Sequence, residues 1–194
     1  ENVGLWYLDP YARQGKRSGA WATTYRSQSS FDGNKNVLAS NNSNFVKPAP
    51  GEALLVSWDD ATTFFHEFGH ALHFFASDVR YPTLNSGVRD YTEFQSQLLE
   101  RWLATDDVIN TYLVHFETGE PMPEELIAKI KKASTFNQGF GTTEYLASAI
   151  MDMKFHLADP TDIDVDAFEK ETLAELNMPK ELPMRHRTPQ FSHV

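Results

Sequence analysis

The sequence is organised around Thr63-Phe64-Phe65-His66-Glu67-Phe68-Gly69-His70-Ala71-Leu72-His73, which contains the pattern His-Glu-x-x-His. Residues four apart on an α-helix project from the same face, so His66 and His70 lie one turn apart. Two imidazoles placed in this way can hold one Zn²⁺ at about 2.0–2.1 Å each. Glu67 lies beside them, where it can take a proton from a zinc-bound water instead of ligating the metal. The pattern therefore predicts a helix with a catalytic zinc site.

The surrounding residues favour a buried helix. Ser57 followed by Asp60 has the spacing of a capping box, and no proline occurs from 61 to 76. The helix is apolar nearly all round, through Phe64, Phe65, Phe68, Leu72, Phe74 and Phe75. A charged Glu67 in so apolar a helix is costly unless it is paired or functional. Gly69 leaves room for a close approach. The alternative is a chance pattern, with two core histidines and a solvated glutamate.

The composition predicts one folded domain. The chain has 194 residues, of which 41% are hydrophobic and 13% aromatic, as in folded globular proteins. That length suffices for one domain with a sizeable core. We therefore expect a single domain over residues 1–194, with a β-containing part at 1–56 and a helical part at 57–194 that carries the zinc site.

Charge and residue types exclude several classes of protein. The 27 acidic residues outnumber the 17 basic ones, so we expect no nucleic-acid partner and no anionic membrane surface. No run approaches the ~20 apolar residues of a membrane span. Without cysteine, zinc ligands must be His, Asp or Glu, which favours a catalytic over a structural site. We expect a cytoplasmic or periplasmic protein. Because the chain opens at Glu1 without a signal-peptide pattern, we expect a fragment or a processed product.

Glu93 is the favoured third zinc ligand. It lies 23 residues after His70, across one loop, near the start of a second helix expected over 90–105. A following antiparallel helix would bring this carboxylate back to the two histidines. Asp78 and Asp90 compete for the role, although an Asp at a loop or helix N-terminus is more simply a cap.

Three further residues lie near these candidates. Gln97 and Glu100 follow Glu93 at i+4 and i+7, so either could orient a ligating imidazole. A solvated helix face is the equal alternative for Glu100. His73 shares the face of the two histidine ligands, and we expect it to be packed behind them rather than to bind the metal.

The remaining elements follow from residue preferences and breakers. Strands are expected at 4–8, 20–25 and 37–40, in a small sheet of about three strands whose edge could carry a peptide substrate. The basic loop 13–19 is predicted to be a solvated hairpin connection, because the Walker pattern of a phosphate loop is missing. Residues 41–44 are polar and favour a turn. Helices are expected at 106–118, 123–135, 142–157 and 165–176, with a loop at 136–141 and an irregular tail from 177.

Two stretches resemble the thimet oligopeptidase and peptidyl-dipeptidase family of zinc peptidases, namely 66–73 and 90–102. Residues 13–21, 136–156 and 185–193 resemble its bacterial peptidyl-dipeptidase (dipeptidyl carboxypeptidase) branch. The resemblance covers essentially the whole chain. It implies a mainly α protein with a small β-sheet and a zincin-like core, part of a catalytic domain that acts on short unstructured peptides in a deep channel.

The resemblance also implies roles for individual residues. His66, His70 and Glu93 match the family's zinc ligands, and Glu67 matches its catalytic base. His193 resembles the histidine that precedes the family's substrate loop, where it would help to stabilise the oxyanion. The tyrosines of that loop would follow the last residue of this chain.

The sequence as a whole predicts a zinc-dependent metallopeptidase with one Zn²⁺ per chain. Its substrates would be short peptides, cleaved either internally or by release of C-terminal dipeptides. Arg185 and Arg187 are candidates for holding a free C-terminal carboxylate. We expect the full-length protein to be a monomer. The alternative is a non-catalytic zinc-binding or interaction fragment that lacks the tyrosines of the substrate loop.

Overall fold

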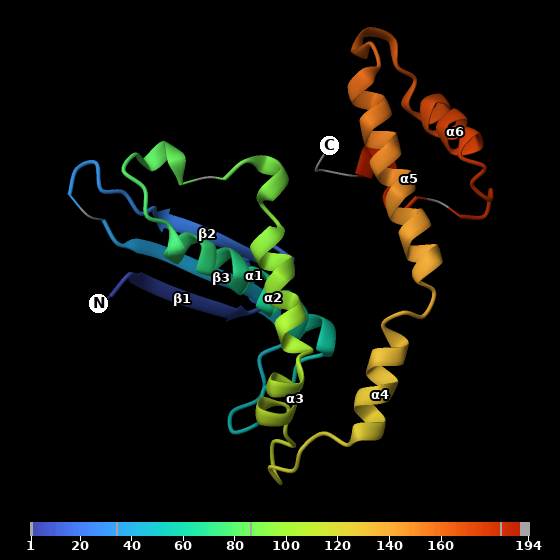
Figure 1. Cartoon of the computed structure of the whole chain (residues 1–194). Coiled ribbons are helices and arrows are strands. Elements are labelled where there is room, and N and C mark those ends of the chain that lie inside the picture. The colour runs from blue at the N-terminus through green and yellow to red at the C-terminus, as the bar shows by residue number, and fades with distance from the viewer. Residues whose placement is uncertain (1, 34, 86, 183, 191–194) are drawn as a thin grey trace. The chain divides into compact units, whose positions relative to one another are not determined.

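The computed structural model describes residues 2–33, 35–85, 87–182 and 184–190. These residues form a mainly helical protein with one three-stranded sheet, as the sequence predicted (Figure 1). The chain divides into two compact units, Glu1–Met122 and Pro123–Val194. Whether these two units form the single domain expected over residues 1–194 stays a prediction. Within the described residues, none of the helices combines the length and the apolar character that a membrane crossing requires.

The sheet lies in the first unit. Its strands are β1 (Gly4–Tyr11), β2 (Trp21–Arg26) and β3 (Val37–Phe45), in the order β1-β3-β2. β3 is the central strand, parallel to β1 and antiparallel to β2. Figure 1 shows the three strands side by side at the blue end of the colour scale.

The turn predicted at 41–44 is wrong, because these residues lie in the middle of β3. Asn41 is 0% exposed. Its Nδ2 donates to the carbonyl oxygen of Glu67 at 2.6 Å, and its Oδ1 accepts from Trp6 Nε1 at 2.6 Å. Buried polar groups are tolerated where they are hydrogen-bonded. Tertiary contacts therefore override the weak preference of asparagine for strands.

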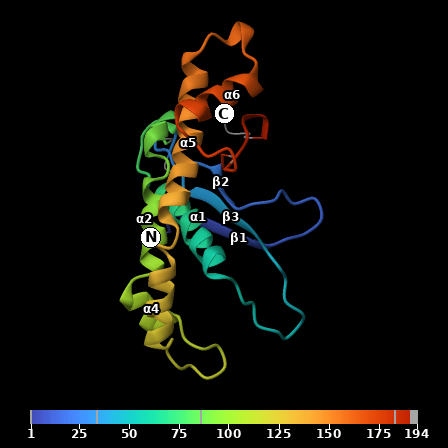
Figure 2. The same cartoon turned by 90° about the vertical axis from the view of Figure 1, so that its right-hand side faces the viewer.

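The helix α1 (Trp58–Ala76) follows the sheet and carries His66 and His70. The predicted capping box is confirmed: Ser57 Oγ accepts from the Asp60 N–H at 3.0 Å, and the Asp60 side chain accepts from the Ser57 N–H. α1 packs against β3 and β2, which Figure 2 shows from the side. Glu67, Gly69 and Ala71 of α1 are buried, whereas Leu72 is 43% exposed. The prediction of a helix buried all round is therefore wrong for the described structure.

A second helix, α2 (Phe94–Leu103), packs along α1 and is followed by α3 (Asp106–Tyr112). The two backbones of α1 and α2 meet at Gly69. A Cβ added there would lie 2.6 Å from Ser96 Cα and 2.8 Å from the carbonyl oxygen of Gln95. The predicted close approach at Gly69 is confirmed. α2 is shorter than expected, because its first residues form a separate 3₁₀ turn at Arg89–Tyr91.

The second unit consists of α4 (Glu124–Ala133), α5 (Gln138–Leu157) and α6 (Val165–Glu175). Its small core is formed by Ala147, Met151 and Met184, with Phe155 and Phe168 stacked beside them. The loop predicted at 136–141 is wrong at its end, because α5 begins at Gln138 and includes both of its glycines.

Candidate metal centre

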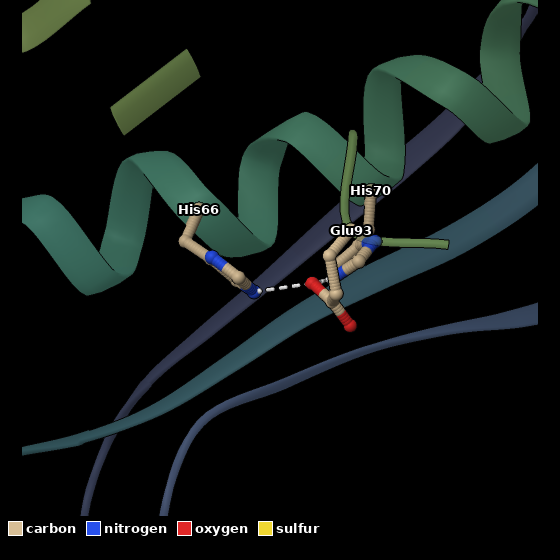
Figure 3. A group of neighbouring side chains, drawn as sticks. All are labelled: His66, His70 and Glu93. Carbon is tan, nitrogen blue, oxygen red and sulfur yellow. Dashed lines mark ion pairs between the residues drawn. The ribbon is translucent and has the colours of Figure 1, made fainter. Parts of the chain in front are cut away.

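The two histidines of the His-Glu-x-x-His pattern and Glu93 come together in the first unit. His66 and His70 project from one face of α1, and the loop after α1 brings Glu93 back to them immediately before α2. Figure 3 shows the three side chains pointing toward one another. His66 Nε2 lies 3.1 Å from Glu93 Oε2, and His70 Nε2 lies 3.2 Å from the same oxygen. One ligand atom from each residue lies within 4.8 Å of the other two.

These distances fit a shared metal ion. Two ligands at 2.0–2.1 Å from a tetrahedral zinc lie about 3.3 Å from each other. The distances from Glu93 Oε2 to the two imidazole nitrogens are close to that value. An unprotonated imidazole nitrogen and a carboxylate oxygen both present lone pairs, which a proton or a metal ion between them can accept. A proton can serve one such pair, whereas a metal ion serves all three atoms.

The second ring nitrogen of His66 is held from the other side. His66 Nδ1 lies 2.5 Å from Oε1 of Glu100 on α2. With Nδ1–H donating to this carboxylate, Nε2 presents its lone pair toward Glu93 and a metal. The sequence left open whether Glu100 orients an imidazole or lies on a solvated helix face. Its contact with His66 Nδ1 is the one that an orienting role requires.

Glu67 lies next to this group and is only 8% exposed. Burial raises the pKa of its carboxyl, against the opposing effect of His66, and the negative charge of Glu93 raises this pKa further. The backbone of Ala22 on β2 also hydrogen-bonds to Glu67. Burial lowers the pKa of His70, which favours the neutral imidazole that binds metals.

A pocket opens over these groups. It is lined from the start of β2, from α1 and from the loop between α1 and α2 by Ala20, Trp21, Ala22, His66, Glu67, His70, His73, Phe74, Asn85, Gly87, Thr92 and Glu93. His73 thus lies in the pocket wall, where its ring stacks with that of Phe74. The pocket therefore lies against all three side chains of the metal-compatible group.

The other predicted site residues lie elsewhere. In the described part of the chain, the metal-compatible group comprises His66, His70 and Glu93, so Asp78 and Asp90 are not included. Gln97 is exposed, and no described hydrogen bond joins it to either histidine.

The tail residues belong to the second unit or lie beyond the described residues. Arg187 pairs with Glu169 at 3.0 Å and with Asp166, and the hydrogen bond to Glu169 raises the pKa of its guanidinium. Arg185 is exposed. His193 lies outside the described residues.

Two residues at the site were missed from the sequence. Ser96 Oγ lies 2.7 Å from Glu93 Oε2, and Asn41 holds the backbone of Glu67. The spacing of Ser96, three residues after Glu93 at a helix start, is a signal that could have found it. Asn41 gives no comparable local signal.

A His-Glu-x-x-His helix completed by a glutamate at the start of the next helix has the donor set of a metal-dependent peptidase. The whole chain, residues 1–194, matches Peptidase family M3, so it belongs to this family of metallopeptidases.

Several curated relatives carry related names. The chain is 39% identical over 197 residues to "Dipeptidyl carboxypeptidase" of Escherichia coli (strain K12), with 99% of this chain and 29% of the relative covered. It is 34% identical to "Oligopeptidase A" of the same organism over 89% of this chain and 26% of the relative. It is 31% identical to "Thimet-like oligopeptidase" of Dictyostelium discoideum, over 82% of this chain and 25% of the relative. The chain thus spans less than a third of the length of these relatives.

Proposed function

We propose that the chain carries the zinc site of a metallopeptidase with a zincin-like core, in which His66, His70 and Glu93 bind one Zn²⁺. The observation that carries the proposal is the convergence of Glu93 Oε2 with both Nε2 atoms at 3.1 and 3.2 Å. When bound, zinc would polarise a substrate carbonyl and lower the pKa of a water toward ~7.

The residues around the metal position supply the proton chemistry. Glu67 would take a proton from the attacking water and return it to the leaving amine. Its burial beside the histidines supports this role, because a raised carboxyl pKa brings base and acid forms closer to balance near neutral pH. Glu100 would hold His66 in the tautomer that leaves Nε2 free for the metal. His193 remains our candidate for oxyanion stabilisation.

The proposed substrates are short peptides. The relatives' names, dipeptidyl carboxypeptidase and oligopeptidase A, support either release of C-terminal dipeptides or internal cleavage. The pocket is bordered by the first residues of β2, which is an edge strand of the sheet. An extended peptide could add to such an edge through its backbone. Arg185 remains a candidate for binding a free carboxylate, whereas Arg187 is already paired with two acidic side chains.

The test combines zinc content with hydrolysis of a short peptide blocked at its N-terminus. The wild-type chain should hold one zinc and cleave the peptide. His66→Ala should lose zinc, and Glu67→Gln should keep zinc but not cleave. The same peptide with a C-terminal amide would separate the two specificities, because dipeptide release needs the free carboxylate.

Two outcomes would count against the proposal. One zinc per chain without any cleavage by the wild type would support the alternative of a non-catalytic zinc-binding chain. Failure of fresh, chelator-free protein to bind zinc would overturn the assignment of the three ligands.

A further inference from the structure

Glu93 reaches the two histidines with little support from packing. It directly precedes α2, its side chain does not cap the helix, and that side chain is 52% exposed. Fixing a glutamate side chain in one rotamer opposes its conformational entropy. A carboxylate held in one place at this position therefore needs a specific restraint.

Ser96 is placed to supply that restraint. Its Oγ lies 2.7 Å from Glu93 Oε2 and 3.0 Å from the carbonyl oxygen of Glu93. A hydroxyl has one proton to donate, and the shorter distance and the negative charge both favour Oε2. This is the oxygen that faces Nε2 of His66 and of His70. A carboxylate oxygen that accepts one hydrogen bond keeps a lone pair for a metal.

Ser96 is itself fixed relative to the histidines. It is 0% exposed, and its Cα lies against Gly69 of α1, where a Cβ would approach it to 2.6 Å. Because α1 also carries His66 and His70, the contact at Gly69 sets the position of the hydroxyl relative to both imidazoles. The buried Ser96 thereby connects the Glu93 carboxylate to α1, the helix that carries both histidines.

We propose that Ser96 is a positioning residue, which orients the Glu93 carboxylate toward the metal by donating a hydrogen bond to Oε2. This inference rests on the proposed zinc site. Hydrogen-bond partners of ligating carboxylates fix their orientation, and their loss lowers metal affinity by ~10–100-fold. Ser96 is not among the residues that line the pocket, so its effect on a substrate would be indirect.

The test measures the Zn²⁺ affinity of the 194-residue chain by competition with a chromophoric chelator. Ser96→Ala removes the hydroxyl at little change in volume, and affinity should fall by ~10–100-fold. Ser43→Ala is the matched control. Ser43 is a buried serine of β3 whose Oγ has no hydrogen-bond partner among the described residues. Its loss should leave zinc affinity unchanged. Wild-type affinity in Ser96→Ala would overturn the proposal.

A double variant separates positioning from a general loss of structure. In a Glu93→Ala background, Ser96→Ala should no longer change zinc affinity, because no carboxylate remains to be oriented. The absorption spectrum of bound Co²⁺ should change in Ser96→Ala and not in Ser43→Ala. An equal loss of affinity in both backgrounds would overturn the positioning role. A wild-type chain that binds no zinc would instead overturn the metal site, and with it the proposed function.

Discussion

Glu100 Oε1 lies 2.5 Å from His66 Nδ1, on the side of the imidazole away from the Nε2 atom that faces Glu93. The His66 ring thus contacts two carboxylates, that of Glu93 just before α2 and that of Glu100 within α2. The Nδ1 contact restricts both the tautomer and the orientation of the ring.

Replacing Glu100 should weaken zinc binding. Glu100→Ala removes the acceptor for Nδ1–H, so zinc affinity should fall by ~10–100-fold in a chelator competition. Gln97→Ala is the control, because Gln97 lies one turn earlier on the same helix and is exposed. Equal affinities of the two variants would contradict an orienting role for Glu100.

Adding a methyl group at Gly69 should destabilise the first unit. In Gly69→Ala the new Cβ would overlap the backbone of Ser96 and Gln95, and overpacking of this kind costs about 1–3 kcal/mol. The control is Gly141→Ala, in α5, where a Cβ meets no atom within 4 Å. That change should stabilise its helix by about 0.5–1 kcal/mol. Denaturant unfolding of both variants checks the opposite signs, and a neutral Gly69→Ala would contradict the close contact.

Removing the side chain of Asn41 should loosen α1 from the sheet. Asn41→Ala leaves Trp6 Nε1 without its acceptor and removes the bond to the Glu67 carbonyl, at a cost of about 1–3 kcal/mol. Asn36→Ala is the comparison, since Asn36 is exposed and its side chain bonds to the backbone of Asn2. Its effect should stay within about 0.5 kcal/mol. Similar midpoints in urea would show that the buried pair of hydrogen bonds does not anchor the helix.

Acid should weaken the connection between β1 and β2. The hydrogen bond from Arg13 holds the pKa of Asp9 below its ordinary value, and Lys16 adds to this effect. The side chain of Lys16 is only 3% exposed, so its ammonium depends on Asp9 and on two backbone oxygens. A carboxylate with a lowered pKa contributes stability above its unfolded pKa, and this contribution disappears as the pH falls through the folded pKa.

The Asp9→Asn variant should therefore be less stable than the wild type at neutral pH, and the difference should shrink in acid. The effect should be small, because the side chain of Asp9 is 36% exposed and solvent screens the pair. Unfolding free energies measured at several pH values check the trend. The control is Asp32→Asn, at an exposed position, whose unfolding free energy should differ little from that of the wild type. A gap for Asp9→Asn that widens as the pH falls would contradict the argument.

The parts of the site that depend on local spacing could be predicted from the sequence. The interval of four between His66 and His70 places both on one helix face, and the Ser57–Asp60 spacing gives the start of that helix. Glu93 could be named because it follows after one loop, at the start of the next helix. The position of Glu93 just before α2, outside the helix, could not be predicted, because the chain between 89 and 93 forms its own short turn.

The parts that depend on distant contacts could not be predicted. Asn41 bonds to residues 35 and 26 positions away, and only those partners make a buried polar residue stable in a central strand. Local preference alone favours a turn at 41–44. The balance between solvation and pairing at Glu100 likewise depends on where α2 lies against α1, which no local pattern encodes.

The contact at Gly69 also limits how the ligand set can change. The main chains of α1 and α2 already touch there, so the helices cannot move closer to accommodate a shorter side chain. Exchanging Glu93 for aspartate would keep the charge and withdraw the carboxylate by one methylene, and the contact at Gly69 opposes a compensating approach of α2 to α1. Backbone contact between α1 and α2 thus limits how far the separation of the proposed ligands can adjust, and it favours the longer acidic side chain at position 93.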